Sequence, residues 1–317
     1  MRERHVRVYA PASISNLGPG FDVLGLAIDR PGDYVVAKRK RENGLSFSVR
    51  PGRGGMDVPL NAGENVAAHV AALMLEEFKP SFGVNMVLEK KMPIGSGLGS
   101  SAASSAAAVV AVNALLQKPS KKKDLLRFAV EGERKASGSP HADNAAPSLL
   151  GGVCLIRSYQ PLEVISLPVK NTILWVVVHP HLTVRTEEAR RTLPKEIPLR
   201  SAVQQWGNVS GLTAGLMKGD VRLVGRCIED VIVEPVRAKL IPGFHEVKQA
   251  ALAAGAFGCS ISGSGPSLFA VTDSARNARK IGAAMMEAFG QTAALKCDIY
   301  ISKVNLEGAK VLTILSR

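Results

Sequence analysis

Residues 91–104, Lys-Met-Pro-Ile-Gly-Ser-Gly-Leu-Gly-Ser-Ser-Ala-Ala-Ser, are the part of this sequence that most constrains its fold. Gly95, Gly97 and Gly99 interrupt a hydrophobic run, and the Ala-rich segment that follows predicts a helix. Glycines turn tightly and bring backbone N–H groups close to a ligand. A helix that begins directly after them adds unpaired N–H donors and the positive end of its dipole. Because phosphate binds well to that arrangement, the stretch predicts a nucleotide site.

Length and composition indicate a globular protein of two domains. The chain has 317 residues, of which 46% are hydrophobic, and a typical domain has roughly 100–200 residues. No apolar run reaches the roughly 18 residues of a membrane span. Residues 1–5 lead into a strand-like alternation without the apolar core of a signal peptide. We therefore expect a cytoplasmic protein that has no membrane partner.

The net charge is +13, from 40 Lys and Arg residues against 27 Asp and Glu residues. Such a charge can indicate nucleic-acid binding, but the basic residues do not cluster with aromatic ones. A solvated surface that favours anionic metabolites is the better explanation, so no nucleic-acid partner is expected. The four cysteines form no CxxC pair, which argues against a zinc ribbon or a redox dithiol.

Helix and strand patterns occur in both halves of the chain. Strands are expected at 5–10, 33–39, 45–49, 83–88, 153–157, 164–167, 173–179, 258–262, 267–272, 298–304 and 310–315, and helices at 64–78, 101–116, 123–137, 141–150, 187–192, 201–217, 221–229, 244–254 and 275–289. Residues 11–25 are dense in Gly, Pro, Ser and Asn, which predicts an ordered functional loop. Residues 158–171 are the best domain boundary. The order lacks the regular βαβα alternation of a doubly wound sheet.

The glycine-rich stretch fits neither of two common nucleotide motifs. A Walker A loop needs GxxxxGK[ST], and no match is present. A Rossmann fingerprint needs GxGxxG after a strand, whereas these glycines alternate and then give way to Ser-Ser-Ala-Ala. The remaining pattern, Pro93-x-Gly-Ser-Gly-Leu-Gly-Ser-Ser-Ala-Ala, resembles the phosphate loop of the GHMP kinases.

Other segments narrow this resemblance to the homoserine kinases within that superfamily. Residues 15–26, 137–152, 234–237 and 241–243 resemble their motifs, and residues 261–266 resemble the third GHMP motif. The resemblance implies an α+β, two-domain GHMP kinase fold. A ribosomal-protein-S5-like, ATP-binding domain would span residues 1–160 and a ferredoxin-like domain residues 161–317, with the active site between them.

The same resemblance implies an activity. The chain is expected to use ATP and Mg²⁺ to phosphorylate the side-chain hydroxyl of L-homoserine, which gives O-phospho-L-homoserine in threonine biosynthesis. A homodimer is the expected assembly. Two alternatives remain open: another GHMP enzyme that acts on a mevalonate-type substrate, and a basic protein that binds RNA through its Ser/Gly loops.

The resemblance also assigns the nucleotide and metal residues. ATP would contact Pro93, Ile94, Gly95, Ser96, Gly97, Leu98, Gly99, Ser100, Ser101, Ala102 and Ala103. Magnesium prefers hard oxygen ligands and usually keeps several waters, and Ser101 and Glu133 are its candidate ligands. A surface salt bridge to Arg134 or Arg127 is the alternative role for Glu133.

Homoserine has an ammonium, a carboxylate and a hydroxyl group, and the resemblance assigns residues to each. The substrate-binding set is Asn16, Asp22, His141, Arg190, Arg237 and Gly263, with Gly265 as a second close-approach glycine. Asp22 would hold the ammonium group, and Arg190 and Arg237 would clamp the carboxylate through their planar guanidinium groups. Turn formation is the alternative role for both Asn16 and Asp22.

Asn144, Thr186 and Arg190 are the expected catalytic residues. Many GHMP kinases carry Asp at the position of Asn144, but an amide cannot take up a proton at neutral pH. We therefore expect phosphoryl transfer without a side-chain general base. Asp143 should point about 100° away on a helix, and we interpret it as structural. Thr186 is expected to contact the transferred phosphate, to cap a helix, or both.

Overall fold

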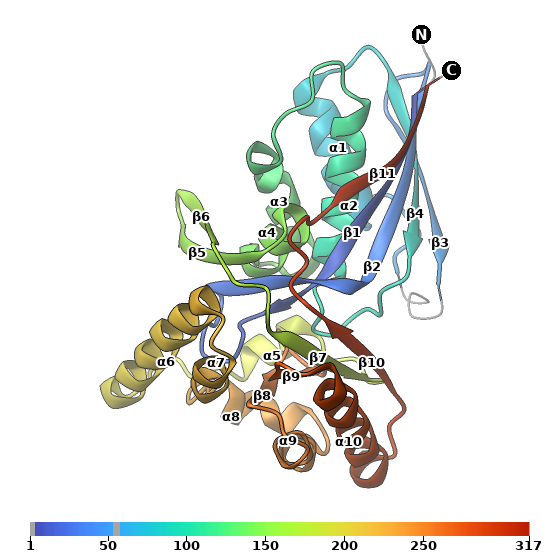
Figure 1. Cartoon of the computed structure of the whole chain (residues 1–317). Helices are drawn as coiled ribbons and strands as arrows, with labels where there is room; N and C mark the ends of the chain where they lie inside the picture. Colours follow the sequence, from blue (N-terminus) through green and yellow to red (C-terminus); the bar gives the residue numbers. More distant parts are fainter. Residues whose placement is uncertain (1–3, 53–57, 317) are drawn as a thin grey trace.

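The computed structural model describes residues 4–52 and 58–316. Most of the first half of the chain builds one sheet with seven strands (Figure 1). These strands are β1 (Arg4–Ser15), β2 (Leu24–Lys40), β3 (Leu45–Pro51), β4 (Gly83–Lys90), β5 (Val153–Tyr159), β6 (Leu162–Leu167) and β11 (Lys310–Ser316). The main order is β11-β1-β2-β4-β3, and β5 pairs with β2 and with β6. Buried Val6 and Val8 alternate with exposed His5 and Arg7 in β1, so one sheet face forms core.

Residues 11–25 do not form the single long loop expected from their composition. β1 and β2 pair antiparallel over residues 13–15 and 25–27. Ala12 and Ile14 are fully buried in this part of β1, because the apolar alternation continues through the Pro- and Ser-rich sequence. The loop is therefore only the short connection between the two strands.

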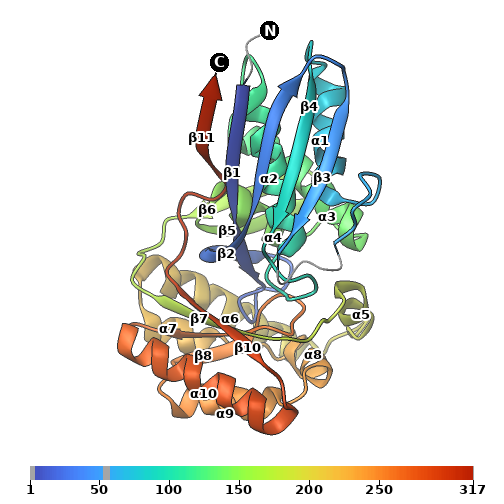
Figure 2. The ribbon, with the colours of Figure 1, turned by 90° about the vertical axis from the view of Figure 1, so that its right-hand side faces the viewer.

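Four helices cover one face of this sheet (Figure 2). They are α1 (Val66–Phe78), α2 (Ser100–Leu115), α3 (Leu126–Ser137) and α4 (Ala142–Leu150), with a short 3₁₀ helix, η1 (Lys122–Leu125), before α3. Residues 102–112 of α2 are all buried, and α2 packs against β1, β2 and the other three helices. A helix that is apolar on all sides needs such an environment. The predicted buried helix is confirmed.

The second half builds a four-stranded sheet in the order β10-β7-β9-β8. Its strands are β7 (Leu174–Pro180), β8 (Gly258–Ile261), β9 (Leu268–Thr272) and β10 (Cys297–Ser302). The helices of this half are α5 (Thr186–Arg191), α6 (Leu199–Lys218), α7 (Val221–Cys227), α8 (Glu234–Arg237), α9 (Phe244–Ala253) and α10 (Ala275–Ala293), with η2 (Ala238–Leu240) after α8. α9 and α10 pack against this sheet around a second core.

Two strands cross the domain division expected at residues 160 and 161. β6 pairs antiparallel with β5, and β11 pairs antiparallel with β1, so both belong to the first sheet. The two chain ends consequently lie side by side at the same end of the molecule (Figure 1). β6 pairs with its neighbour in sequence, whereas β11 pairs with a strand from the opposite end of the chain, and no local pattern at residues 158–171 reports either pairing. Among the described helices, none is long and apolar enough to cross a membrane.

Candidate active site

A cavity of about 610 Å³ opens between the two halves of the molecule. The glycine loop, the start of α2, α3 and α4 line it from the first half, and α5, α8 and the turn at residues 262–266 line it from the second. The predicted substrate, catalytic and metal residues all line it: Asn16, Asp22, Ser101, Glu133, His141, Asn144, Thr186, Arg190, Arg237 and Gly263. The structure therefore brings together residues from seven separate parts of the sequence.

The glycine loop joins the end of β4 to the start of α2. Gly95, Gly97 and Gly99 all have positive φ angles, of 63°, 74° and 65°. These are left-handed conformations, which glycine adopts without steric cost. Gly99 is the residue before α2, and no side chain of the residues that the structure describes caps the helix there. The first N–H groups of α2 are thus left for another acceptor, which suits a phosphate group.

A second glycine turn supports this loop from the other half of the molecule. Ser262 Oγ donates to the Gly97 carbonyl at 2.7 Å, and Ser267 Oγ donates to the Ser96 carbonyl at 2.6 Å. The Ser267 hydroxyl also lies 3.1 Å from Nδ1 of His179, a buried residue of β7. Burial lowers the pKa of His179 to about 4, so the imidazole is neutral at pH 7. The sequence offered no sign of this role for His179.

The expected ATP-binding residues divide into two groups. Ile94, Gly95, Ser96, Gly97, Gly99, Ser100 and Ser101 line the cavity. The side chains of Leu98, Ala102 and Ala103 are fully buried instead. The carbonyl of Pro93 accepts a hydrogen bond from Ser96 Oγ at 2.9 Å, which closes the loop on itself. Contacts between ATP and any of these residues stay a prediction.

Glu133 and Ser101 fit a magnesium site. The Glu133 side chain is buried, and its Oε1 has no hydrogen-bond partner among the described residues. Burial raises the pKa of Glu133 to about 7, although the Ser101 side chain and the charge of Lys90 lower it. No group of three or more His, Cys, Asp and Glu side chains capable of holding a metal occurs in the part of the chain that the structure describes. Magnesium needs only one or two protein carboxylates when it also binds substrate phosphates.

Asp22, Arg190 and His141 form one contact group. Arg190 Nη2 donates to both carboxylate oxygens of Asp22, at 3.0 and 2.9 Å, and to His141 Nε2 at 2.9 Å. Because a guanidinium group can only donate, Nε2 must be unprotonated and the proton lies on Nδ1. Nδ1 is 2.9 Å from Ser137 Oγ, which can accept it. Burial lowers the pKa of His141 to about 4, in agreement with a neutral ring.

Arg237 lies beside this group and is almost completely buried. Its Nη1 donates to the Gly263 carbonyl at 2.8 Å, and Asn16 Nδ2 donates to the same carbonyl at 3.0 Å. Burial lowers the pKa of Arg237 to about 10, which leaves it charged at neutral pH. The guanidinium carbons of Arg190 and Arg237 lie 5.5 and 5.1 Å from the centre of the Phe21 ring. Phe21 therefore holds both cations through its ring, and sequence patterns did not indicate it.

Asn144 and Thr186 occupy different walls of the cavity. Asn144 Oδ1 accepts from Ser13 Oγ at 2.8 Å, and its Nδ2 donates to Ser15 Oγ at 3.0 Å. Both amide atoms are thus oriented by β1. Thr186 is the first residue of α5, and Arg185 occupies the capping position. The helix-capping role considered for Thr186 is therefore wrong, and its hydroxyl faces Ser264 Oγ at 3.4 Å.

Asp143 differs from the expectation that it points away from the site. It lines the cavity, its side chain is buried, and its Oδ1 has no hydrogen-bond partner within residues 4–52 and 58–316. Burial, with a smaller contribution from the charges of Asp22 and Glu133, raises the pKa of Asp143 to about 8. Asp143 and Asn144 both line the cavity, so the expected angle of about 100° between them does not exclude Asp143 from the site.

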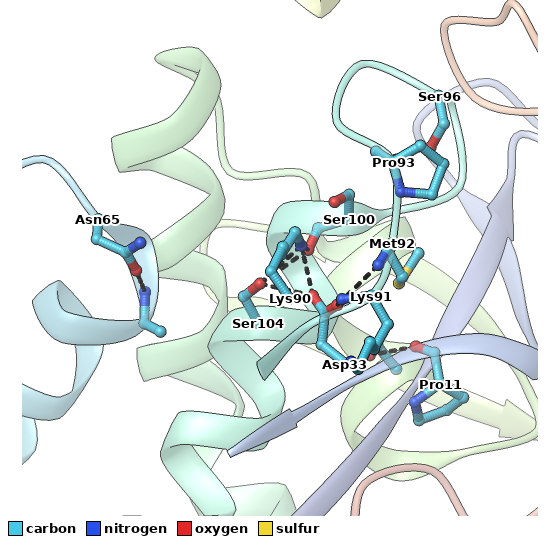
Figure 3. Close-up of polar contacts among 12 residues, drawn as sticks. Pro11, Asp33, Asn65, Lys90, Lys91, Met92, Pro93, Ser96, Ser100 and Ser104 are labelled. Atoms are coloured by element: carbon cyan, nitrogen blue, oxygen red, sulfur yellow. Dashed lines mark hydrogen bonds and ion pairs between the residues drawn. The ribbon is translucent and has the colours of Figure 1, made fainter. Parts of the chain in front are cut away.

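Two further residues that the sequence patterns did not single out, Asn65 and Lys90, line the cavity, and both are labelled in Figure 3. Asn65 precedes α1, and its Oδ1 accepts from the N–H of Ala67 at 3.0 Å. Lys90 ends β4 and is buried. An Asn before an apolar helical pattern is a capping signal that could have identified the first of them.

Similarity to known proteins covers both halves of the chain. Residues 65–152 match the GHMP kinases N terminal domain, and residues 212–291 match the GHMP kinases C terminal domain. A homoserine kinase of Chlorobium phaeobacteroides is 49% identical, over 97% of this chain and 99% of that protein. A homoserine kinase of Pyrococcus furiosus is 42% identical, over 96% of this chain and 99% of that protein.

A solved structure gives the same result. The crystal structure of homoserine kinase from Cytophaga hutchinsonii has 50% sequence identity and a TM-score of 0.93, and the match covers 97% of each chain. The expected α+β, two-domain GHMP kinase fold is confirmed. With relatives this similar along nearly the whole chain, the protein belongs to the homoserine kinase family of the GHMP kinases.

Proposed function

We propose that this chain transfers the γ-phosphoryl group of ATP to the side-chain hydroxyl of L-homoserine and so makes O-phospho-L-homoserine for threonine biosynthesis. One observation carries the proposal most directly. The cavity that contains the glycine loop also contains Asp22, Arg190 and Arg237, whose charges complement a free amino acid. The named activity of the relatives that share almost the full chain supports the same reaction.

In this proposal the glycine loop and the start of α2 bind the phosphates of ATP through backbone N–H groups. Ser101 and Glu133 hold magnesium, which supplies positive charge to the phosphate oxygens. The unpartnered Oε1 of Glu133 supports this role, since a buried carboxylate oxygen is otherwise expected to have a partner. Mg²⁺ as the cofactor is inferred from this donor set and from the kinase family.

Arg190 and Arg237 bind the substrate carboxylate, and Asp22 binds the ammonium group. The position of both guanidinium groups against Phe21 supports a shared carboxylate clamp. A mevalonate-type substrate is less favoured because mevalonate has a carboxylate but no ammonium group to pair with Asp22. His141 is neutral at pH 7, so it serves as a hydrogen-bonding group without adding charge.

Phosphoryl transfer then depends on position and electrostatics. Asn144, which β1 orients through two serines, directs the substrate hydroxyl, and Thr186 contacts the transferred phosphoryl group. An amide cannot remove the hydroxyl proton, so the proton leaves to a phosphate oxygen or to water. A loose transition state makes such catalysis sufficient for phosphoryl transfer.

ADP release with a panel of acceptors tests the proposed reaction. The panel is homoserine, mevalonate, galactose, shikimate and threonine, each with ATP and MgCl₂. We expect turnover with homoserine and background rates with the other four. No turnover with homoserine would refute the proposal, and turnover with mevalonate alone would support the mevalonate-type alternative.

Arg237→Lys tests the carboxylate clamp separately. Lysine keeps the charge but loses the planar fork, so the KM for homoserine should rise about tenfold or more while the KM for ATP stays within about twofold. Arg191→Lys is the matched control, because Arg191 is exposed and its one ion pair among the described residues is with Glu187. Equal changes in both KM values for Arg237→Lys would argue against the clamp.

Cytoplasmic location and a homodimer stay predictions from the sequence. Light scattering on the purified protein measures the mass of the assembly and so tests the homodimer directly. A mass of two chains is the expected result, and a mass near 33.5 kDa would contradict it.

A further inference from the structure

A buried polar cluster lies directly beneath the glycine loop (Figure 3). At its centre is Asp33 of β2, which is fully buried. Lys90, the last residue of β4, forms an ion pair with it, and the Lys90 side chain is 2% exposed. Ser104 of α2 completes the cluster. These three residues come from a strand in the sheet, the strand that enters the loop, and the helix that leaves it.

Asp33 binds the entrance of the loop with one oxygen and the helix with the other. Its Oδ1 accepts the backbone N–H of Lys91 at 2.8 Å and that of Met92 at 3.0 Å. Its Oδ2 accepts the Ser104 hydroxyl at 2.7 Å and the Lys90 ammonium group. The carboxylate is therefore saturated by donors from both ends of the glycine loop.

Lys90 makes the second connection to the helix. Its Nζ donates to the Ser100 carbonyl at 2.8 Å and to Ser104 Oγ at 2.9 Å, in addition to Asp33. An ammonium group has three donors, and these three acceptors use all of them. Ser100 and Ser104 belong to the first turns of α2, where the unpaired N–H groups lie.

Stability alone is a weak explanation for this cluster. Burying two opposite charges requires both to lose water, and a well-packed apolar pair of similar volume is often equally or more stable. The glycine loop, by contrast, has three residues with positive φ between its two ends, so its backbone has many accessible conformations in the unfolded chain. Fixing both ends to one carboxylate restricts where the backbone N–H groups point.

We infer that Asp33 is a positioning residue of the nucleotide site, which acts through Lys90 and Ser104 to hold the glycine loop and the first turns of α2 in the geometry that binds phosphate. The inference rests on the proposed function only in that the loop must bind ATP. It assigns no contact between Asp33 and the nucleotide.

The first test compares two neighbouring serines of α2. Ser104→Ala removes one hydrogen bond to Asp33 and one to Lys90. Ser105→Ala is the matched control, because Ser105 is equally buried on the same helix and its hydroxyl has no hydrogen-bond partner among the described residues. We expect the Kd for ADP with magnesium, from isothermal titration calorimetry, to rise about fivefold for Ser104→Ala and to stay within about twofold for Ser105→Ala.

The second test removes the charges together. Asp33→Asn combined with Lys90→Met leaves no unpaired buried charge, so folding should survive. The variant loses the ion pair and both hydrogen bonds from Lys90 to the first turns of α2. The Kd for ADP should rise about tenfold or more at a temperature well below the melting point, while the KM for homoserine changes less than about threefold. A purely structural cluster would lower Tm and leave the Kd of the folded protein unchanged.

The outcomes separate this inference from the proposed function. If the wild-type protein does not bind ADP, the nucleotide site itself is wrong. If the wild type binds ADP and the variants Ser104→Ala and Asp33→Asn/Lys90→Met bind it equally well, only the positioning role is overturned. A homoserine KM that rises as much as the ADP Kd would also overturn it, because the effect would then extend to the whole cavity.

Discussion

Arg190 and Asp22 form an ion pair inside the cavity, with Nη2 at 3.0 and 2.9 Å from the two carboxylate oxygens. Their side chains are 35% and 29% exposed, so the pair remains accessible to a ligand. An amino acid carries both opposite charges, and its binding would let each residue exchange its present partner for a group of the substrate. A ligand with only one charge could replace the ion-pair partner of either Arg190 or Asp22 but not of both.

Asp22→Asn should change the preference for the substrate amine. The wild type should use homoserine far better than 4-hydroxybutyrate, which lacks the ammonium group. When 4-hydroxybutyrate is bound, the Asp22 carboxylate has no ammonium group to pair with. In the variant, kcat/KM for homoserine divided by kcat/KM for 4-hydroxybutyrate should fall about tenfold or more. Steady-state kinetics with saturating ATP measures the ratio, and an unchanged ratio would place the ammonium group elsewhere.

Gly97→Ala should weaken nucleotide binding. A Cβ at Gly97 would lie 2.3 Å from the Ser262 carbonyl oxygen and 2.7 Å from that of Gly265, so the two glycine turns would have to separate. Gly138→Ala is the control, because Gly138 has the same φ of 74° and no atom of the described part of the chain lies within 4 Å of the added Cβ. We expect a Kd for ADP at least about tenfold higher for the first variant and unchanged for the second. Equal binding by both would show that the close contact does not matter.

Asn144→Asp tests the absence of a side-chain base. A carboxylate here would add negative charge near the transferred phosphoryl group and the buried Asp143, so we expect kcat to fall about tenfold. The pH profile of kcat/KM should gain no new acidic limb. A higher kcat together with such a limb would mean that the new carboxylate acts as a base and that the wild-type reaction is limited by its absence.

Acid should destabilise the protein through His179 and His141. Burial lowers both pKa values to about 4, below the ordinary 6.5, so the unfolded chain binds more protons between these values. The stabilising contribution is therefore present above pH 6.5 and is lost as the pH falls toward 4. For His179 the loss between pH 7 and pH 5 is about 2 kcal/mol. His179→Asn should consequently show a smaller drop in Tm over this range than the wild type, as measured by calorimetry.

Most of the secondary structure was predictable because its causes are local. The residues of α2 are apolar on all sides, so the sequence predicts a buried helix independently of where it lies in the fold. The three glycines before it indicate the left-handed turns that the structure contains. The limits of β1 were not predictable from composition, since residues 11–15 contain Pro and Ser yet pair within the sheet. The sequence resemblance alone likewise indicates Asp22, His141 and Arg237, which line the cavity.

The sequence by itself determined the phosphate loop, the helix behind it and the family, because these depend on short motifs and on backbone preferences at single residues. Only the tertiary structure decided that Asp33 holds both ends of that loop, that Asp143 faces the cavity, and that β11 joins the first sheet. Each of these depends on which distant strands pair and in which register. A contact between residues far apart in the chain leaves no local pattern in the sequence. Which polar groups need hydrogen-bond partners depends on burial, because a buried group can no longer bond to water.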